Sequence, residues 1–182
     1  MAEPCRSAPT LETERLRLRG WRRDDREPYF NILQEPAVFR HIGPEPMGME
    51  DSWRRMMAAV GGWQLNGFGG WAVERKADRR LVGMTALFNG WRAMEPQFGD
   101  EPEMGWIFAT ETHGQGIAGE ACRAILGWAE QTLEPTPIWA IIAPANEPSL
   151  RLAAKLGFAT VGETLYHDEP TIVLKRPAWA AA

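Results

Sequence analysis

Residues 111–121 read Glu-Thr-His-Gly-Gln-Gly-Ile-Ala-Gly-Glu-Ala, and this glycine-rich stretch decides how the rest of the chain is interpreted. An apolar, β-favouring segment, residues 104–109, precedes it, and a helical pattern of apolar residues follows from 120 to 133. The glycines therefore fall where a strand leads into a helix. There the first N–H groups of the helix lack partners, and glycine lets a phosphate approach the backbone. The pattern predicts an anion-binding loop, with a plain tight turn as the alternative.

Two familiar phosphate-binding motifs do not describe this loop. No Gly-Lys-Ser or Gly-Lys-Thr follows the glycines, so a P-loop is excluded, together with a nucleotide-phosphate enzyme built on one. The spacing Gly114-x-Gly116-x-x-Gly119 fits the Rossmann fingerprint, but too much chain precedes it for a first βαβ unit. No acidic residue closes a second strand about 20 residues later.

A second block, residues 146–158, reads Asn-Glu-Pro-Ser-Leu-Arg-Leu-Ala-Ala-Lys-Leu-Gly-Phe. Taken with the glycine loop, it resembles the GNAT superfamily of acyl-CoA N-acyltransferases. The loop fits that family's Q/R-x-x-G-x-G/A pattern at Gly116 and Ala118. The later block fits N-x-x-S followed by Leu-Gly-Phe, at Asn146, Ser149 and residues 156–158.

Two further segments carry the resemblance, which spans roughly residues 11–176. Residues 103–106 look like the E-x-G-aromatic start of the family's fourth strand, and residues 11–19 look like the first strand of the branch that acetylates ribosomal-protein N-termini. His113 departs from the pattern, because Gln or Arg stands there most often in the family.

The expected fold is an α/β domain with a mixed, mostly antiparallel central sheet, flanking helices and splayed fourth and fifth strands. Sequence patterns place strands at residues 15–19, 69–75, 81–88, 103–109, 138–143, 159–166 and 171–174. They place helices at residues 24–34, around 53–60, at 120–133 and at 148–156. We expect one domain over residues 1–182, with an ordered core at about 11–176 and short loose tails.

Composition agrees with a globular cytoplasmic protein of 182 residues, with 45% hydrophobic and 24% charged residues. No apolar run reaches the length of a membrane span, and the N-terminus lacks a signal-peptide layout. A formal net charge of −4 argues against nucleic acid as a partner. Cys5 and Cys122 are far apart in unlike contexts, so no disulfide framework is expected. The histidines and cysteines lack metal-ligand spacing, so no metal is expected.

The resemblance implies acetyl-CoA as co-substrate. It places the pyrophosphate on backbone N–H groups of residues 115–119, and the extended pantetheine arm against the free edge of the fourth strand. The implied cofactor-binding residues are Ile107, Phe108, Ala109, Gly114, Gln115, Gly116, Ile117, Ala118, Gly119, Asn146 and Ser149.

Glu103 is the candidate general base, because a primary amine is mostly protonated at pH 7 and must lose a proton. If the strand alternates, Glu103, Gly105 and Ile107 share one face. The alternative is a buried structural glutamate paired to an arginine. Three loop carboxylates could also act as the base: Glu95, Asp100 and Glu101.

Ser149 matches the family's serine that donates a hydrogen bond to the CoA sulfur. It could instead cap the helix at residues 148–156, and both roles can hold. The tyrosine that many family members use a few residues later is absent, since residues 153–155 read Ala-Ala-Lys. Tyr166 is the only other tyrosine in this half of the chain.

These features predict an enzyme that moves an acetyl group directly to a primary amine, either a protein N-terminus or a small amine. The rival is a CoA-binding regulatory module that has lost catalysis. Residues 42–49 and 89–100 would determine the acceptor. Trp63 and Trp91 could line an acceptor pocket or the face of a homodimer, or pack in the core.

Overall fold

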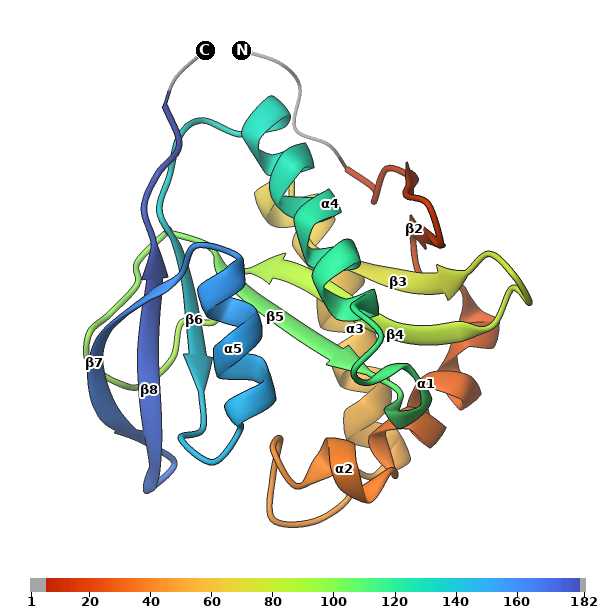
Figure 1. Ribbon diagram of the computed structural model, residues 1–182, viewed down its shortest axis with the longest axis horizontal. Helices are drawn as coiled ribbons and strands as arrows, with labels where there is room; N and C mark the ends of the chain where they lie inside the picture. The colour runs from red at the N-terminus through yellow and green to blue at the C-terminus, as the bar shows by residue number, and fades with distance from the viewer. Residues whose placement is uncertain (1–5, 181–182) are drawn as a thin grey trace.

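The protein is built on an eight-stranded sheet with the strand order β1-β2-β3-β4-β5-β6-β8-β7, seen in the computed structural model of Figure 1. The structure describes residues 6–180, so Cys5 and the outermost parts of the predicted tails lie outside the described residues. The strands are β1 Leu11–Glu12, β2 Leu16–Arg19, β3 Gly70–Arg75, β4 Leu81–Phe88, β5 Glu103–Phe108, β6 Ile138–Ile142, β7 Ala159–Tyr166 and β8 Glu169–Arg176.

All neighbouring strands pair antiparallel except β5 and β6. These two pair in parallel at one register position only, Glu103 opposite Trp139, and then diverge, as Figure 1 shows. The short β1 was not predicted and precedes the first predicted strand. The fourth and fifth predicted strands are therefore β5 and β6 of the structure. The predicted fold class, including their splay, is confirmed.

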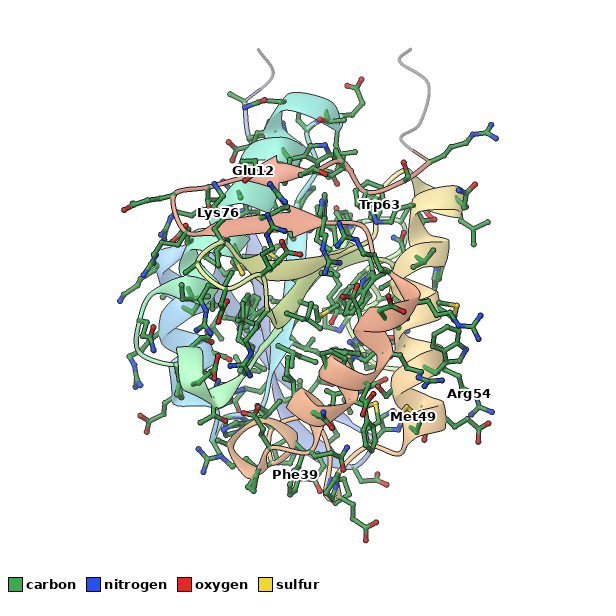
Figure 2. The ribbon with its side chains drawn as sticks, turned by 90° about the vertical axis from the view of Figure 1, so that its right-hand side faces the viewer. Glu12, Phe39, Met49, Arg54, Trp63 and Lys76 are labelled. Carbon is green, nitrogen blue, oxygen red and sulfur yellow. The ribbon has the colours of Figure 1, made fainter. Side chains whose placement is uncertain are left out.

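Within residues 6–180, five α-helices and two 3₁₀ helices flank this sheet. They are η1 Arg23–Asp25, α1 Arg26–Leu33, α2 Pro36–Phe39, α3 Met49–Asn66, η2 Thr110–Thr112, α4 Ile117–Thr132 and α5 Glu147–Lys155. In Figure 1, α4 and α5 cover the near face of the sheet, and α3 lies behind it. Figure 2, turned by 90°, shows α3 running along one side of the molecule from Met49 to Trp63.

Side chains of β5 alternate between two apolar clusters, as a strand buried on both faces requires. Met104 and Phe108 pack in the cluster that holds α4 and α5. Ile107 packs with α1 residues and with Ile42 and Met47 in a second cluster. Glu103, an even number of residues from Ile107, lies on the face opposite α4 and α5.

Several predicted boundaries moved for identifiable reasons. Helix α4 begins at Ile117, three residues before the prediction, because Gly116 in the left-handed region (φ +76°) is its N-cap. Strand β8 is longer than residues 171–174, because the β7–β8 hairpin continues to its turn. His167 and Asp168 form that turn with positive φ angles.

The two tryptophans whose roles the sequence left open differ in burial. Trp63 is 2% exposed and contacts Trp71 and Trp128 edge to face, with ring centroids 4.5 and 5.4 Å away. Its pocket or dimer-face interpretation is therefore wrong, and it is a core residue. Trp91 is 69% exposed.

Candidate active site

The glycine loop joins β5 to α4 and presents free backbone donors. Gly114 and Gly116 both adopt positive φ angles, 74° and 76°, which only glycine takes without strain. The first intrahelical bond of α4 runs from the Glu120 N–H to the Gly116 carbonyl at 3.0 Å. The N–H groups of residues 117–119 therefore have no acceptor within the helix, and they lie at the positive end of its dipole. This geometry can bind an anion.

Two arginines lie beside this loop, and the charge of one of them, Arg15, is offset by the Glu120 carboxylate in the first turn of α4. The Arg15 guanidinium donates to the Gln115 carbonyl at 2.9 Å and pairs with Glu120 at 2.7 Å. An Arg123 guanidinium nitrogen would lie 3.2 Å from a Cβ placed on Gly119. Both arginines escaped sequence reasoning. Arg15 lies 100 residues away in sequence, and Arg123 had no signal beyond its place in the second turn of the helix.

His113, the departure from the family pattern, ties the loop to the end of β5. Its Nε2 lies 2.9 Å from the Phe108 carbonyl oxygen, and the Thr112 hydroxyl donates to the Ala109 carbonyl at 2.7 Å. Residues 107–109 and the glycine loop therefore form one continuous segment. Ile107 and Ala109 face the α1 side of the sheet, and Phe108 faces α4.

The splay leaves the β6-facing edge of β5 without a strand partner beyond Glu103, within the described part of the chain. An extended, amide-rich chain can pair with such an edge as an added strand does. The edge begins beside Glu103 and ends at the glycine loop, so a ligand with an anionic group and an extended arm fits both features at once.

A hydrogen bond at Ser149 links β5 to α5, the helix that follows β6. The Trp106 indole N–H on β5 donates to the Ser149 hydroxyl oxygen at 3.2 Å. Asn146, and not Ser149, caps α5, because the Asn146 side-chain oxygen accepts the Ser149 N–H at 3.3 Å. The capping role predicted as an alternative for Ser149 is therefore wrong. This contact uses the Ser149 hydroxyl oxygen as an acceptor, and a hydroxyl can also donate one bond.

Glu103 makes a bidentate ion pair with Arg92, at 2.6 and 2.7 Å, and is 2% exposed. Burial alone would lower the pKa of the Arg92 guanidinium, but the hydrogen bonds and charge of Glu103 outweigh burial and the pKa is raised. Arg92 also lies over the Tyr166 ring, 4.8 Å from its centroid. A Cβ on Gly90 would lie 2.7 Å from a Glu103 oxygen, so a side chain at this position would have to displace the Glu103 carboxylate.

The structure thus shows the arginine pairing that sequence left open as the alternative for Glu103. Sequence reasoning did not identify Arg92 as the partner, and its position in a loop gave no signal. Among the substitute carboxylates, Glu101 pairs with Lys175 at 3.1 Å and accepts the Trp139 indole N–H. Glu95 and Asp100 are exposed.

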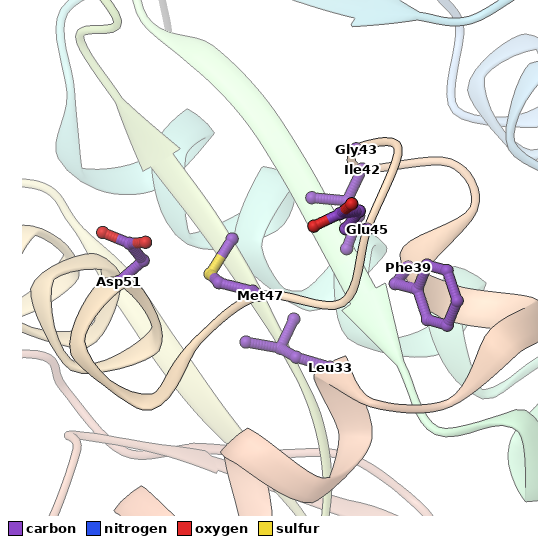
Figure 3. Close-up of a pocket in the computed structure, with 7 residues that line it drawn as sticks. All are labelled: Leu33, Phe39, Ile42, Gly43, Glu45, Met47 and Asp51. Atoms are coloured by element: carbon purple, nitrogen blue, oxygen red, sulfur yellow. The ribbon is translucent and has the colours of Figure 1, made fainter.

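A cavity of about 200 Å³ lies between the end of α1, α2 and the segment leading into α3 (Figure 3). Its lining combines apolar side chains with two carboxylates. The lining residues are Leu33, Phe39, Ile42, Gly43, Glu45, Met47 and Asp51. Ile42 and Met47 pack against the cluster that contains Ile107, so the cavity lies on the face opposite α4 and α5.

Residues 6–180 contain no group of three or more His, Cys, Asp or Glu side chains arranged to hold a metal ion. No helix in this part of the chain is long and apolar enough to cross a membrane.

Comparison with known proteins gives the family. Residues 15–159 match the family described as "Acetyltransferase (GNAT) domain". The uncharacterized N-acetyltransferase YoaA of Bacillus subtilis is 28% identical over 155 residues, covering 85% of each chain.

Solved structures agree with this match. An acetyltransferase from Agrobacterium tumefaciens superposes with a TM-score of 0.79 at 26% identity, over 93% of this chain and 94% of that one. A structure of AAC(6')-Ib with paromomycin and acetyl-CoA shares the fold, with a TM-score of 0.72 at 15% identity over 90% and 94% of the two chains. The chain belongs to the GNAT family of acetyltransferases.

Proposed function

We propose that this enzyme transfers an acetyl group from acetyl-CoA directly to a primary amine, either a protein N-terminus or a small amine. One observation carries the proposal: the glycine loop, with its unpaired first-turn N–H groups, opens onto the splay between β5 and β6. The fold neighbour AAC(6')-Ib, solved with acetyl-CoA, supports the choice of co-substrate.

In this proposal the N–H groups of residues 116–119 hold the pyrophosphate, with Arg123 adding positive charge. The Gln115 N–H, predicted as a further donor, already donates to the Thr112 carbonyl at 3.4 Å. Within residues 107–109 the Ala109 N–H already donates to the Val82 carbonyl at 2.9 Å. The alternate peptide groups of this segment that face the gap pair with the pantetheine arm and hydrogen-bond the thioester oxygen, which gains charge during transfer. The co-substrate supplies the activated acyl group and a thiolate as leaving group. Asn146 fixes the start of α5, and the Ser149 hydroxyl donates a hydrogen bond to the departing sulfur.

Glu103 is proposed to accept the proton of the acceptor amine, through a water molecule. It lies on the face opposite α4 and α5, from which an acceptor can reach the splay. Each carboxylate oxygen has two acceptor positions, so the two bonds from Arg92 leave capacity for a water. The ion pair also has a structural role, and the two roles require separate tests.

An acceptor screen tests the function, with release of the CoA thiol as the readout. The acceptors are short peptides that begin with Ala or Ser, spermidine, and paromomycin. Acetylation of at least one amine supports the proposal. Failure to bind acetyl-CoA by calorimetry would refute it. Tight binding without transfer to any amine would favour the catalytically inactive CoA-binding module.

A matched pair of variants separates the two roles of Glu103. Glu103→Gln removes the proposed base and should lower turnover by roughly 10²–10⁴-fold. Arg92→Met breaks the same ion pair but keeps the carboxylate, so its turnover should fall much less. Equal losses in the two variants would show that the pair matters only for structure, and attention would move to Glu95, Asp100 and Glu101.

Three further proposals rest on the sequence alone: a single domain over residues 1–182, cytoplasmic localisation, and assembly as a homodimer or a weakly associating monomer. Light scattering of the purified protein decides the last of these.

A further inference from the structure

Glu35 connects two parts of the molecule that are 75 residues apart in sequence. Its carboxylate accepts the backbone N–H of Thr110 at 2.6 Å. Thr110 directly follows Ala109, the last residue of the proposed co-substrate edge, and it is the first residue of η2. The first N–H groups of a helix have no acceptor within the helix, and the carboxylate satisfies one of them. The bond therefore anchors the point at which the chain leaves β5 and turns toward the glycine loop.

The junction between α1 and α2 holds Glu35 itself in place. Pro36 follows it, and a residue before proline favours extended backbone, so α1 ends here and Glu35 has a ψ of 124°. The Glu35 carbonyl then accepts the N–H groups of Val38 and Phe39 at 2.8 and 3.0 Å. One residue thus starts α2 with its backbone and holds the end of β5 with its side chain.

The same junction forms part of the wall of the cavity in Figure 3. Gln34, the neighbour of Glu35, donates a side-chain N–H to the Met47 carbonyl at 2.8 Å. Leu33 and Phe39, on either side of the junction, line the cavity together with Met47. A change in the position of Glu35 would therefore be passed on to residues that line this cavity.

The C-terminal end of α2 also lies close to the loop that leads to the glycines. Burial lowers the pKa of the His41 imidazole, and the charges of Arg40 and His113 lower this pKa further. The Arg40 Nε–H donates to His41 Nε2 at 3.2 Å. Because charges on a protein surface act only over short distances, the effect of His113 places it near His41. Both ends of α2 thus lie beside residues 110–113.

We propose that Glu35 is a positioning residue that couples the binding of acetyl-CoA to the order of the cavity wall at α2. By holding the Thr110 N–H, it fixes the peptide groups of residues 107–109 relative to α2. This inference rests on the proposed function. Such coupling is reciprocal: if acetyl-CoA orders α2, the ordered α2 must in turn strengthen the binding of acetyl-CoA.

Acetyl-CoA alone is the probe, so the test requires no identified acceptor. In hydrogen–deuterium exchange of the parent protein, acetyl-CoA should slow the amides of residues 107–119 and also those of residues 36–43. Glu35→Ala should keep the first effect and lose the second. It should also weaken acetyl-CoA binding in calorimetry by about 2–10-fold, the contribution of one hydrogen bond.

The sign of the change in affinity separates positioning from charge. Loss of a carboxylate near an anionic co-substrate would by itself strengthen binding. Glu35→Gln removes the charge but keeps an oxygen that can accept the Thr110 N–H, so it should retain the parent affinity and the slowed exchange. Thr110→Pro removes the donor and changes no charge, and the ψ of 140° at Ala109 suits a residue before proline. It should behave like Glu35→Ala.

A double variant and a matched control complete the experiment. Glu35→Ala combined with Thr110→Pro should weaken acetyl-CoA binding no more than either change alone, because both remove the same bond. The control, Glu27→Gln, removes an exposed carboxylate in the first turn of α1. It should change neither the affinity nor the exchange of residues 36–43.

The proposal is overturned if acetyl-CoA slows exchange at residues 107–119 of the parent but not at residues 36–43, a result under which the proposed function survives. It is also overturned if Glu35→Ala keeps the effect at residues 36–43, or binds acetyl-CoA as tightly as the parent does. Additive losses in the double variant would overturn it too. Failure of the parent to bind acetyl-CoA would instead refute the proposed function itself.

Discussion

The Arg92–Glu103 pair should show a strong coupling free energy between its two members. Its side chains are 19% and 3% exposed, so the pair is largely buried. Removing one partner of a buried pair costs about 3–5 kcal/mol, because the remaining charge has no partner. Arg92→Met leaves the more deeply buried charge, Glu103, alone and should cost about 3–5 kcal/mol. Glu103→Gln keeps an amide oxygen for one hydrogen bond and should cost about 1–3 kcal/mol.

The double variant measures the coupling free energy between Arg92 and Glu103. Once Glu103→Gln has replaced the carboxylate by a neutral amide, the unpaired charge that makes Arg92→Met costly is gone. The double variant should therefore be destabilised by less than the sum of the single variants, by at least about 1.5 kcal/mol. Urea unfolding gives the free energies. In a chain of 182 residues, about 3 kcal/mol corresponds to a fall in Tm of about 6–12 °C.

Additive free energies, within about 0.5 kcal/mol, would refute this reasoning. They would mean that solvent or another group stabilises each charge when its partner is removed. Gly90→Ala is an independent check, since its Cβ would lie 2.7 Å from a Glu103 oxygen and should disturb the pair without changing a charge.

Further outcomes are expected at three sites: Gly116, Trp63 and Cys122. Gly116→Asp puts a carboxylate beside the proposed pyrophosphate site, at a position where φ is +76°, and should abolish acetyl-CoA binding in calorimetry. The control, Gly127→Asp, lies in the later half of α4 with open space at its Cβ position and should not change binding. Trp63→Ala should cost about 3–5 kcal/mol in urea unfolding, because it empties the centre of a tryptophan cluster. Burial raises the pKa of the Cys122 thiol to about 12, so peptide mapping after iodoacetamide treatment at pH 8 should find Cys122 unlabelled in the folded protein and labelled in urea. Because the folded protein keeps this proton, the contribution of Cys122 to stability is present below about pH 9 and is lost as the pH rises toward 12.

Local patterns predicted most of the sheet. Strand β4 was predicted to the residue, and β3, β5 and β6 to within one residue, because turn residues and apolar runs mark their ends. Helix α4 was placed three residues late, since a pattern of apolar residues does not show which glycine adopts a left-handed cap.

Side-chain partners were harder to predict because they depend on tertiary contacts. The sequence suggested that Glu103 could pair with an arginine, but it could not choose Arg92 among the many arginines of the chain. Trp63 and Trp91 looked alike in composition, with glycines beside both. A helical spacing of seven residues from the buried Met56 was the one signal that could have placed Trp63 in the core.

The divergence of β5 from β6 also predicts how the backbone exchanges with solvent. Beyond Glu103, alternate peptide groups of β5 bond to β4, while the others face the gap and have no strand partner there. Their amide hydrogens should exchange with deuterium quickly in the free protein. When the co-substrate occupies the gap and takes those bonds, the same amides should become protected, and stability should rise by RT ln(1 + [L]/Kd), about 2.7 kcal/mol at a hundredfold excess over Kd. In this sense the sheet lacks one strand in its interior, and in the proposed complex the extended arm of the co-substrate takes the position of that strand.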